Sequence, residues 1–196
     1  VFDGNGATDG AMSDQSFEYD EEKALSGNNF EREYTVTYNY KYDTPNTTDT
    51  AEYSFSKWTG IVGGASRDFE DEETVKNLSA EAGSTVTLAA QWTGGSVTLP
   101  APTRNGYSFL GWYENEDFSG DSHSGGSSFT ATANTTLYAR WEAVQYTISY
   151  RDSLDEDYTN SQNYYITDNA ALLSVSKKGY DFAGWAPSNN SGTNWT

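Results

Sequence analysis

The 196-residue chain contains no cysteine, one histidine, one methionine and four prolines. The absence of cysteine excludes disulfides, thiol catalysis and cysteine-based zinc sites. No apolar run approaches the roughly 20 residues that a membrane-spanning helix needs, and no signal peptide is recognisable. The sequence begins on a strand-like pattern at Val1 and Phe2. We therefore expect it to be a piece of a longer protein whose targeting signals lie elsewhere.

Basic residues are also scarce. The 11 Lys and Arg residues face 29 Asp and Glu residues, which gives a formal net charge of −18. Nucleic-acid affinity comes largely from Lys and Arg that neutralise phosphates. The charge therefore argues against nucleic acid as a partner, and against anionic membrane surfaces or direct membrane insertion.

What the chain does contain is aromatic side chains, glycine and β-branched residues. Hydrophobic residues make up 35% of the sequence and aromatic residues 15%, with 18 glycines. Each large ring can bury roughly 150–250 Å², so small cores built on Tyr, Phe and Trp are feasible. This composition favours a mainly β fold with many strands, tight turns and little helix.

One aromatic pattern recurs along the chain. Residues 106–112 (GYSFLGW) return as residues 179–185 (GYDFAGW), and a diverged copy stands at residues 52–58 (EYSFSKW). The alternation of rings with small or polar residues predicts a β-strand with one buried face. A motif that recurs within one chain indicates a repeated structural unit.

A second motif follows two of these copies, and a third kind of strand stands apart from them. The second motif is TLAAQW at residues 87–92 and TLYARW at residues 136–141. Residues 34–40 (YTVTYNY) and 146–150 (YTISY) share a β-branched and aromatic pattern that predicts a strand. We expect three repeats, over residues 1–93, 94–143 and 144–196, the first with an inserted hairpin and the third without a closing motif.

These motifs resemble the Listeria–Bacteroides repeat, which is the B-repeat of internalin-like surface proteins. The resemblance is most specific over residues 105–141, and it is also good over residues 179–185. Residues 2–6 (FDGNG) are similar to the opening strand of that repeat, and residues 87–92 to its closing strand. The first unit departs from the pattern, because residues 34–56 look like an extra hairpin and Lys57 stands where the family has glycine.

The resemblance implies β-grasp-like modules in tandem within a secreted, surface-attached or wall-attached bacterial protein. It implies a non-enzymatic spacer, stalk or adhesive segment without a cofactor, and it carries over no catalytic or metal-binding residue. The alternative is a module that binds a glycan or a protein of the host or bacterial surface. Its candidate contact residues are Tyr38, Tyr40, Tyr42 and Trp195. Rings on the hairpin at residues 34–53 could equally form cross-strand pairs that stabilise a thin sheet.

The sequence gives weaker signals for catalysis, metal binding and an internal crosslink. His123 lies in a Gly- and Ser-rich loop beside Asp121 and Ser122, without the strand–turn–helix context of a catalytic serine. The acidic residues Asp152, Asp155, Glu156 and Asp157 could hold calcium or form a solvated loop. An internal isopeptide crosslink could use Lys41, Lys57 or Lys76, but the sequence names no partner for them.

Overall fold

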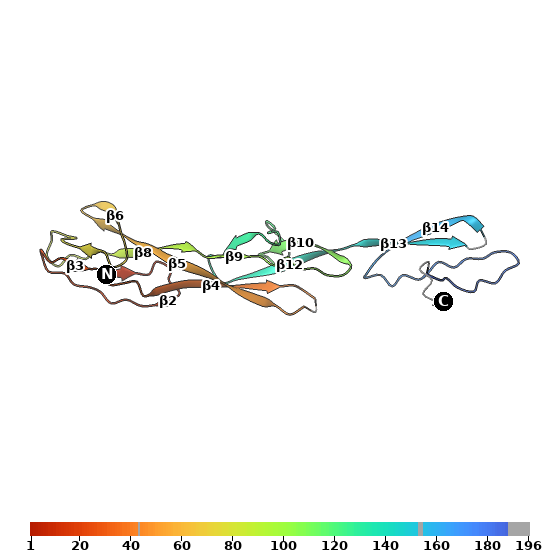
Figure 1. Cartoon of the computed structure of the whole chain (residues 1–196), viewed down its shortest axis with the longest axis horizontal. Coiled ribbons are helices and arrows are strands. Elements are labelled where there is room, and N and C mark those ends of the chain that lie inside the picture. Colours follow the sequence, from red (N-terminus) through yellow and green to blue (C-terminus); the bar gives the residue numbers. More distant parts are fainter. Residues whose placement is uncertain (43, 153–154, 188–196) are drawn as a thin grey trace. The chain divides into compact units, whose positions relative to one another are not determined.

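The structure, a computed structural model, describes residues 1–42, 44–152 and 155–187, with only the backbone of residues 155–158 (Figure 1). It contains strands and no helix over these residues, which confirms the mainly β prediction. The strands are β1 (Phe2–Asp3), β2 (Asp9–Gly10), β3 (Lys23–Ala24), β4 (Phe30–Asn39), β5 (Thr47–Val62), β6 (Ala65–Phe69), β7 (Thr74–Val75), β8 (Leu88–Gly94), β9 (Ser96–Thr98), β10 (Tyr107–Tyr113), β11 (Ser128–Thr130), β12 (Thr135–Ala143), β13 (Gln145–Asp152) and β14 (Asp155–Tyr165). The β-grasp topology remains a prediction.

The chain divides into two compact units. The first comprises Val1–Arg104 and Ser108–Glu142, and the second comprises Asn105–Tyr107 and Ala143–Thr196. The expected repeat boundaries at residues 93 and 143 also remain a prediction.

The principal sheet runs in the order β1-β8-β5-β4-β12-β10, with β2 added to β4 and β6 added to β5. Most neighbours are antiparallel, but two pairs are parallel. In one, Phe2 of β1 lies opposite Leu88 of β8. In the other, Tyr38 of β4 lies opposite Leu137 of β12. Because Leu88 and Leu137 occupy the same place in the two closing motifs, β1 and β4 are equivalent opening strands.

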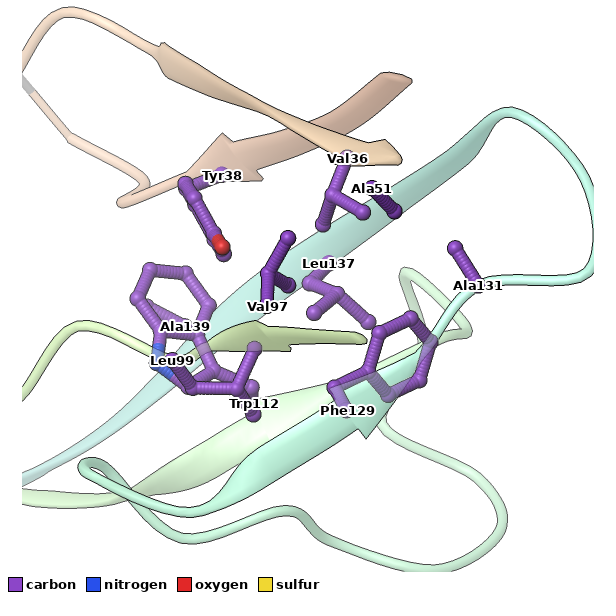
Figure 2. Close-up of a cluster of buried hydrophobic side chains, with 10 residues drawn as sticks. All are labelled: Val36, Tyr38, Ala51, Val97, Leu99, Trp112, Phe129, Ala131, Leu137 and Ala139. Carbon is purple, nitrogen blue, oxygen red and sulfur yellow. The ribbon is translucent and has the colours of Figure 1, made fainter. Parts of the chain in front are cut away.

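The first unit holds two separate hydrophobic cores. The first core consists of Phe2, Leu25, Trp58, Phe69, Val75, Leu88 and Ala90. The second core consists of Val36, Tyr38, Ala51, Val97, Leu99, Trp112, Phe129, Ala131, Leu137 and Ala139. Figure 2 shows side chains from the β4–β5 hairpin facing Trp112, Val97 and Leu137 in the second core.

Long strands connect the two cores. Strand β4 packs Phe30 against the first core and contributes Val36 to the second. Strand β5 returns from Ala51 in the second core to Trp58 in the first. Strands β4 and β5 pair as an antiparallel hairpin, and the half of this hairpin nearer its turn supplies the opening strand of the second core. The two cores are interlocked rather than strung one after the other.

The aromatic contacts repeat three times, as the sequence motif does. An opening-strand ring lies against the motif tryptophan in every copy, with centroid distances of 5.0 Å (Phe2–Trp58), 5.2 Å (Tyr38–Trp112) and 4.7 Å (Tyr150–Trp185). The interplanar angles are 57°, 54° and 54°. Such tilted pairs contribute beyond the area that they bury. Trp112 is fully buried, as its place in the motif predicts, and Trp141 is half-buried against the same core.

Indole hydrogen bonds repeat with the same spacing. Trp112 Nε1 donates to the Pro100 carbonyl at 2.8 Å, and Trp185 Nε1 donates to the Leu173 carbonyl at 2.7 Å. The closing tryptophans behave alike, since Trp92 donates to the Gly4 carbonyl (2.9 Å) and Trp141 to the Tyr40 carbonyl (3.0 Å). In the described part of the chain, buried Trp58 Nε1 has no such partner, so the diverged first copy has lost one of these bonds.

The acidic residues 70–73 lead into a strand and not into a helix. Thr74–Val75 instead forms strand β7, which pairs with β3 at Lys23–Ala24. Glu73 Oε2 accepts a hydrogen bond from the Glu70 backbone and Glu73 Oε1 one from Arg67. These two hydrogen bonds to the Glu73 carboxylate stabilise a turn, and strand β7 follows the turn directly.

Gly111 in the central motif has a backbone that only glycine adopts readily. Its φ is +135°, and a Cβ there would lie 3.1 Å from the His123 carbonyl oxygen. We expect Gly111→Ala to lower the free energy of unfolding by about 1–3 kcal/mol. Gly64→Ala is the matched control, because Gly64 also has a positive φ (+81°) but an added Cβ there meets nothing within 4 Å. Urea denaturation of both variants checks this, and equal losses would contradict a role for the close approach.

Candidate functional site

The candidate contact residues do not share one environment. Tyr38 is 1% exposed and belongs to the second core. Tyr40 is half-buried against Trp112, and its hydroxyl is 3.0 Å from Thr47 Oγ1. Tyr42 is 63% exposed. Trp195 lies outside the described residues. Of the described candidates, Tyr42 has the surface that a ligand could cover.

Tyr42 owes its exposure to the turn that follows β4. Strand β4 ends at Asn39, and Lys41 and Tyr42 then take positive φ values of 61° and 56°. The Asn39 side chain accepts a hydrogen bond from the Lys41 backbone and fixes the turn. Arg104 places its guanidinium carbon 3.6 Å from the centroid of the Tyr42 ring, a cation–π contact between a half-buried guanidinium and an exposed ring.

A second group of rings and cations lies beside this turn, and we call it the basic–aromatic cluster: Lys41, Tyr113, Phe118, Tyr138 and Arg140. Lys41 Nζ is 4.8 Å from the Tyr138 ring centroid and pairs with Glu116 at 2.7 Å. Arg140 lies 5.7 Å from the Phe118 ring and donates to the Tyr113 hydroxyl at 3.4 Å. Sequence reasoning missed this cluster, although Lys41 between two tyrosines and Arg140 within the closing motif were visible signals.

Tyr38 is buried with its hydroxyl directed at an acid. It donates a hydrogen bond to Asp49 Oδ2 at 3.0 Å. Burial, and next the bond to Asp49, raise the pKa of the Tyr38 hydroxyl far above its ordinary value. Tyr150 repeats the arrangement by donating to Gln162 Oε1 at 2.8 Å, so the buried opening-strand tyrosine is a structural element of the repeat.

Because the pKa of Tyr38 is raised on folding, the first unit should lose stability at alkaline pH. Because the folded pKa lies above the unfolded one, this contribution is complete below pH 10.0, the ordinary tyrosine pKa, and is lost as the pH rises beyond it. We expect Tyr38→Phe to make that decline shallower, by up to about 1.4 kcal/mol per pH unit. Urea midpoints of the wild type and the variant from pH 9 to 12 measure this pH dependence of stability. Tyr19→Phe, at a residue that is 77% exposed, should leave the slope unchanged, and an equal slope in both variants would contradict the assignment.

The other chemical candidates have ordinary structural partners. His123 meets Phe129 edge to face, with ring centroids 5.0 Å apart, and its Nε2 lies 3.3 Å from Glu114 Oε1. Its backbone pairs with Trp112, which makes the histidine part of a strand bridge. Lys57 pairs with Asp68, and Lys76 with Asp20 at 3.3 Å. No group of three or more metal-binding side chains occurs among the residues that the structure describes, and the side chains of residues 155–158 are outside it.

The two fully buried motif tryptophans of the first unit lie in different cores. A hollow of about 670 Å³ in the first unit is lined by residues that include Phe17, Leu78 and Val86 and by no tryptophan. Trp58 and Trp112 lie fully buried in separate cores. The recurring indoles therefore serve as core side chains, as the motif predicts.

Two stretches of the chain match a model of a known protein family. The family model described as the Listeria-Bacteroides repeat domain matches residues 68–140 and 146–196. The chain belongs to this repeat family. The first match ends within strand β12, and the second begins at the second residue of β13, so the family pattern restarts where the second compact unit begins its hairpin.

Relatives of the chain are bacterial proteins that are longer than the matched region. The chain is 27% identical to internalin H of Listeria monocytogenes over 188 residues, which cover 82% of this chain and 31% of that protein. It is 26% identical over 163 residues to a protein of Evansella cellulosilytica provisionally named a Gly-rich membrane protein, covering 68% and 19%. The chain thus spans less than a third of these relatives. No solved structure matches it.

The matches make the chain an internalin-like repeat segment. None of the described residues belongs to a helix with the length and apolarity that a membrane span requires.

Proposed function

We propose that this segment is a non-catalytic spacer in a bacterial surface or secreted protein, built to hold another part of that protein away from its attachment point. The family match and the similarity to internalin H support a surface role. The observation that carries the spacer proposal is the interlocking of the first two cores. Strands β4 and β5 pass through both, so pulling on the chain loads hydrogen-bonded strands that the two cores share.

The tests of this proposal are mechanical and geometric. Small-angle scattering should give the full chain a rod-like profile, and single-molecule pulling should release the first unit in one step. A compact globular profile, or two separate release steps within residues 1–142, would contradict the spacer function.

A second function, ligand binding, is favoured by Tyr42 and the basic–aromatic cluster. The exposed ring of Tyr42 on Arg104 resembles the surfaces on which aromatic residues stack against sugars or protein partners. In a chain of net charge −18, three of the 11 basic residues, Lys41, Arg104 and Arg140, lie over these rings. Such cations would favour an acidic glycan or an acidic protein, although Lys41 is also paired with Glu116. A glycan array tests it with the wild type and with Tyr42→Ala. Absence of glycan binding by the wild type at high protein concentration would favour the spacer function.

A further inference from the structure

The two closing strands of the first unit share their core-facing residues but differ in their outward side chains. Both follow the pattern Thr-Leu-x-Ala-x-Trp, and in both the leucine and the alanine belong to a core. Strand alternation turns the two intervening residues to the opposite face. They are Ala89 and Gln91 in β8, and Tyr138 and Arg140 in β12. The repeat fold therefore requires neither the ring nor the guanidinium that the second copy carries there.

The turn after the opening strand shows the same contrast. Asn5 and Lys41 are equivalent, because each has a positive φ (46° and 61°) and each backbone amide donates to the side chain two residues before it. Asn5 Nδ2 then donates to the Ala90 carbonyl at 2.8 Å. Lys41 instead places its ammonium over the Tyr138 ring. The same turn thus forms in both copies, and in the second it adds a cation to the outward face.

One ring joins the two cations of the basic–aromatic cluster. The Phe118 centroid lies 5.9 Å from Lys41 Nζ and 5.7 Å from the guanidinium carbon of Arg140. Tyr113 meets Phe118 edge to face at 5.6 Å. Arg140 is exposed, and in the part of the chain that the structure describes no carboxylate lies within ion-pair distance of it. An exposed guanidinium of this kind can bind a carboxylate through two parallel hydrogen bonds.

The other cation already holds a carboxylate. Glu116 Oε1 lies 2.7 Å from Lys41 Nζ, and 71% of the Glu116 side chain is exposed. Exposed ion pairs are weak, because water and salt screen them and two long side chains must be ordered. Glu116 therefore occupies the cluster as an internal carboxylate that a carboxylate from outside can replace.

We propose that the basic–aromatic cluster binds a sugar ring that carries one carboxylate, with Arg140 as the anchor and Glu116 as the internal competitor. The proposal rests on the ligand-binding function proposed above and names its ligand class. The guanidinium of Arg140 would take the carboxylate. The half-buried rings of Tyr138 and Phe118 would pack against the C–H groups of the saturated ring, as aromatic side chains do in ligand sites.

The surrounding charge restricts the partner to a ligand with few charges. Glu114, Asp117 and Glu142 neighbour the cluster residues in sequence and are exposed, in a chain of net charge −18. An acidic protein would bring many carboxylates against this negative field. Exposed charges more than about 8 Å away are largely screened at physiological ionic strength. A sugar with a single carboxylate therefore gains from Arg140 and Lys41 with little repulsion from the rest of the chain.

A titration of the full ¹⁵N-labelled chain tests the proposal. The probes are the methyl glycosides of glucuronic acid and N-acetylneuraminic acid, each matched by its neutral carboxyl methyl ester. We expect saturable amide shifts at Lys41, Phe118, Tyr138 and Arg140 with an acidic probe, and at least about 10-fold weaker binding of its ester. The acid that binds more tightly distinguishes a uronic from a sialic ligand.

The outcomes separate this inference from the broader ligand-binding function. Equal binding of acids and esters, or binding of neutral glycans alone on the array, would overturn carboxylate recognition and leave ligand binding standing. Absence of binding by every probe and every arrayed glycan would overturn both. Tighter binding of poly-glutamate than of either acidic sugar would overturn the choice of partner.

Three variants locate the site. Arg140→Gln introduces the residue that the first copy has at this position, so the fold should be kept while binding of the acidic probe weakens at least about 10-fold. Glu116→Gln removes the competitor and should tighten binding about 2- to 5-fold. Glu114→Gln is the matched control, because it makes the same change in net charge at a carboxylate that lies beside His123, and it should leave the affinity unchanged. Wild-type affinity in Arg140→Gln, or equal gains in both glutamate variants, would contradict the assigned site.

Discussion

Replacing Trp112 by alanine should destabilise both cores of the first unit, although Trp112 belongs to only one of them. The side chain is fully buried, and Tyr38, Tyr40 and Phe109 pack on it at 5.2–5.5 Å. Removing a buried Trp side chain costs about 3–5 kcal/mol. This is a large fraction of the 5–15 kcal/mol by which a domain is typically stable.

The loss should spread because the cores share strands. Unfolding the second core releases Val36 and Tyr38 of β4 and Ala51 of β5. The same strands carry Phe30 and Trp58 into the first core. The first core would then have to hold strands whose other halves are unfolded, so its stability falls with that of the second core.

Hydrogen exchange measured by mass spectrometry checks this prediction. In Trp112→Ala, amides in the β5–β6 pairing from Trp58 to Phe69 should lose protection together with those of β12. Leu110→Ala is the matched control on the same strand, because Leu110 is 42% exposed. It should leave protection near wild type. If β5–β6 keeps wild-type protection in Trp112→Ala, the two cores fold independently.

The strands themselves could be predicted from the sequence, because period-two patterns are local. The motif at residues 106–112 became most of strand β10, and the closing motifs became β8 and β12. What the pattern could not supply was the strand partners. The pairing of Tyr38 with Leu137 joins residues about 100 positions apart, and a local alternation contains no information on which distant edge it meets.

The diverged copy shows how packing overrides a motif. The family glycine corresponds to Lys57, whose backbone cannot repeat the conformation of Gly111 at low cost. The structure instead places a register shift between Phe55 and Lys57, so that Trp58 still reaches its core. The sequence revealed the departure, but the bulge that accommodates it depends on the pairing of β5 with β8.

The candidate site was only partly predictable for a related reason. Tyr38, Tyr40 and Tyr42 alternate, which predicts one shared face if the strand continues through them. The strand ends at Asn39, and two residues with positive φ turn the chain. Their burial therefore differs from residue to residue, and it is set by a turn that Asn39 fixes.

Placing a charge at Ala51 should destabilise the first unit nearly as strongly as the loss of Trp112. Ala51 is fully buried in the second core on strand β5, and its backbone lies opposite Tyr34 of β4. An aspartate there would be buried without a described cation in the core cluster to pair with. Burying an uncompensated carboxylate costs several kcal/mol, or forces it to take up a proton.

Thr50→Asp is the control that makes the test specific. Thr50 precedes Ala51 on the same strand and is exposed, so the period of two places its side chain on the opposite face. The two variants carry the same charge one residue apart in the same hairpin. We expect Ala51→Asp to lower the urea midpoint sharply at pH 7 and Thr50→Asp to change the free energy of unfolding by about 0.5 kcal/mol or less.

The same pair of variants tests which core the hairpin serves. If β5 stabilises the second core through Ala51, Ala51→Asp should expose the amides of β12 as well as those of the hairpin. A variant that lost only the hairpin, with β12 and Trp112 still protected, would show that the hairpin is an accessory insertion. Partial recovery of Ala51→Asp at pH 4 would identify the buried charge as the cause, because protonation removes it.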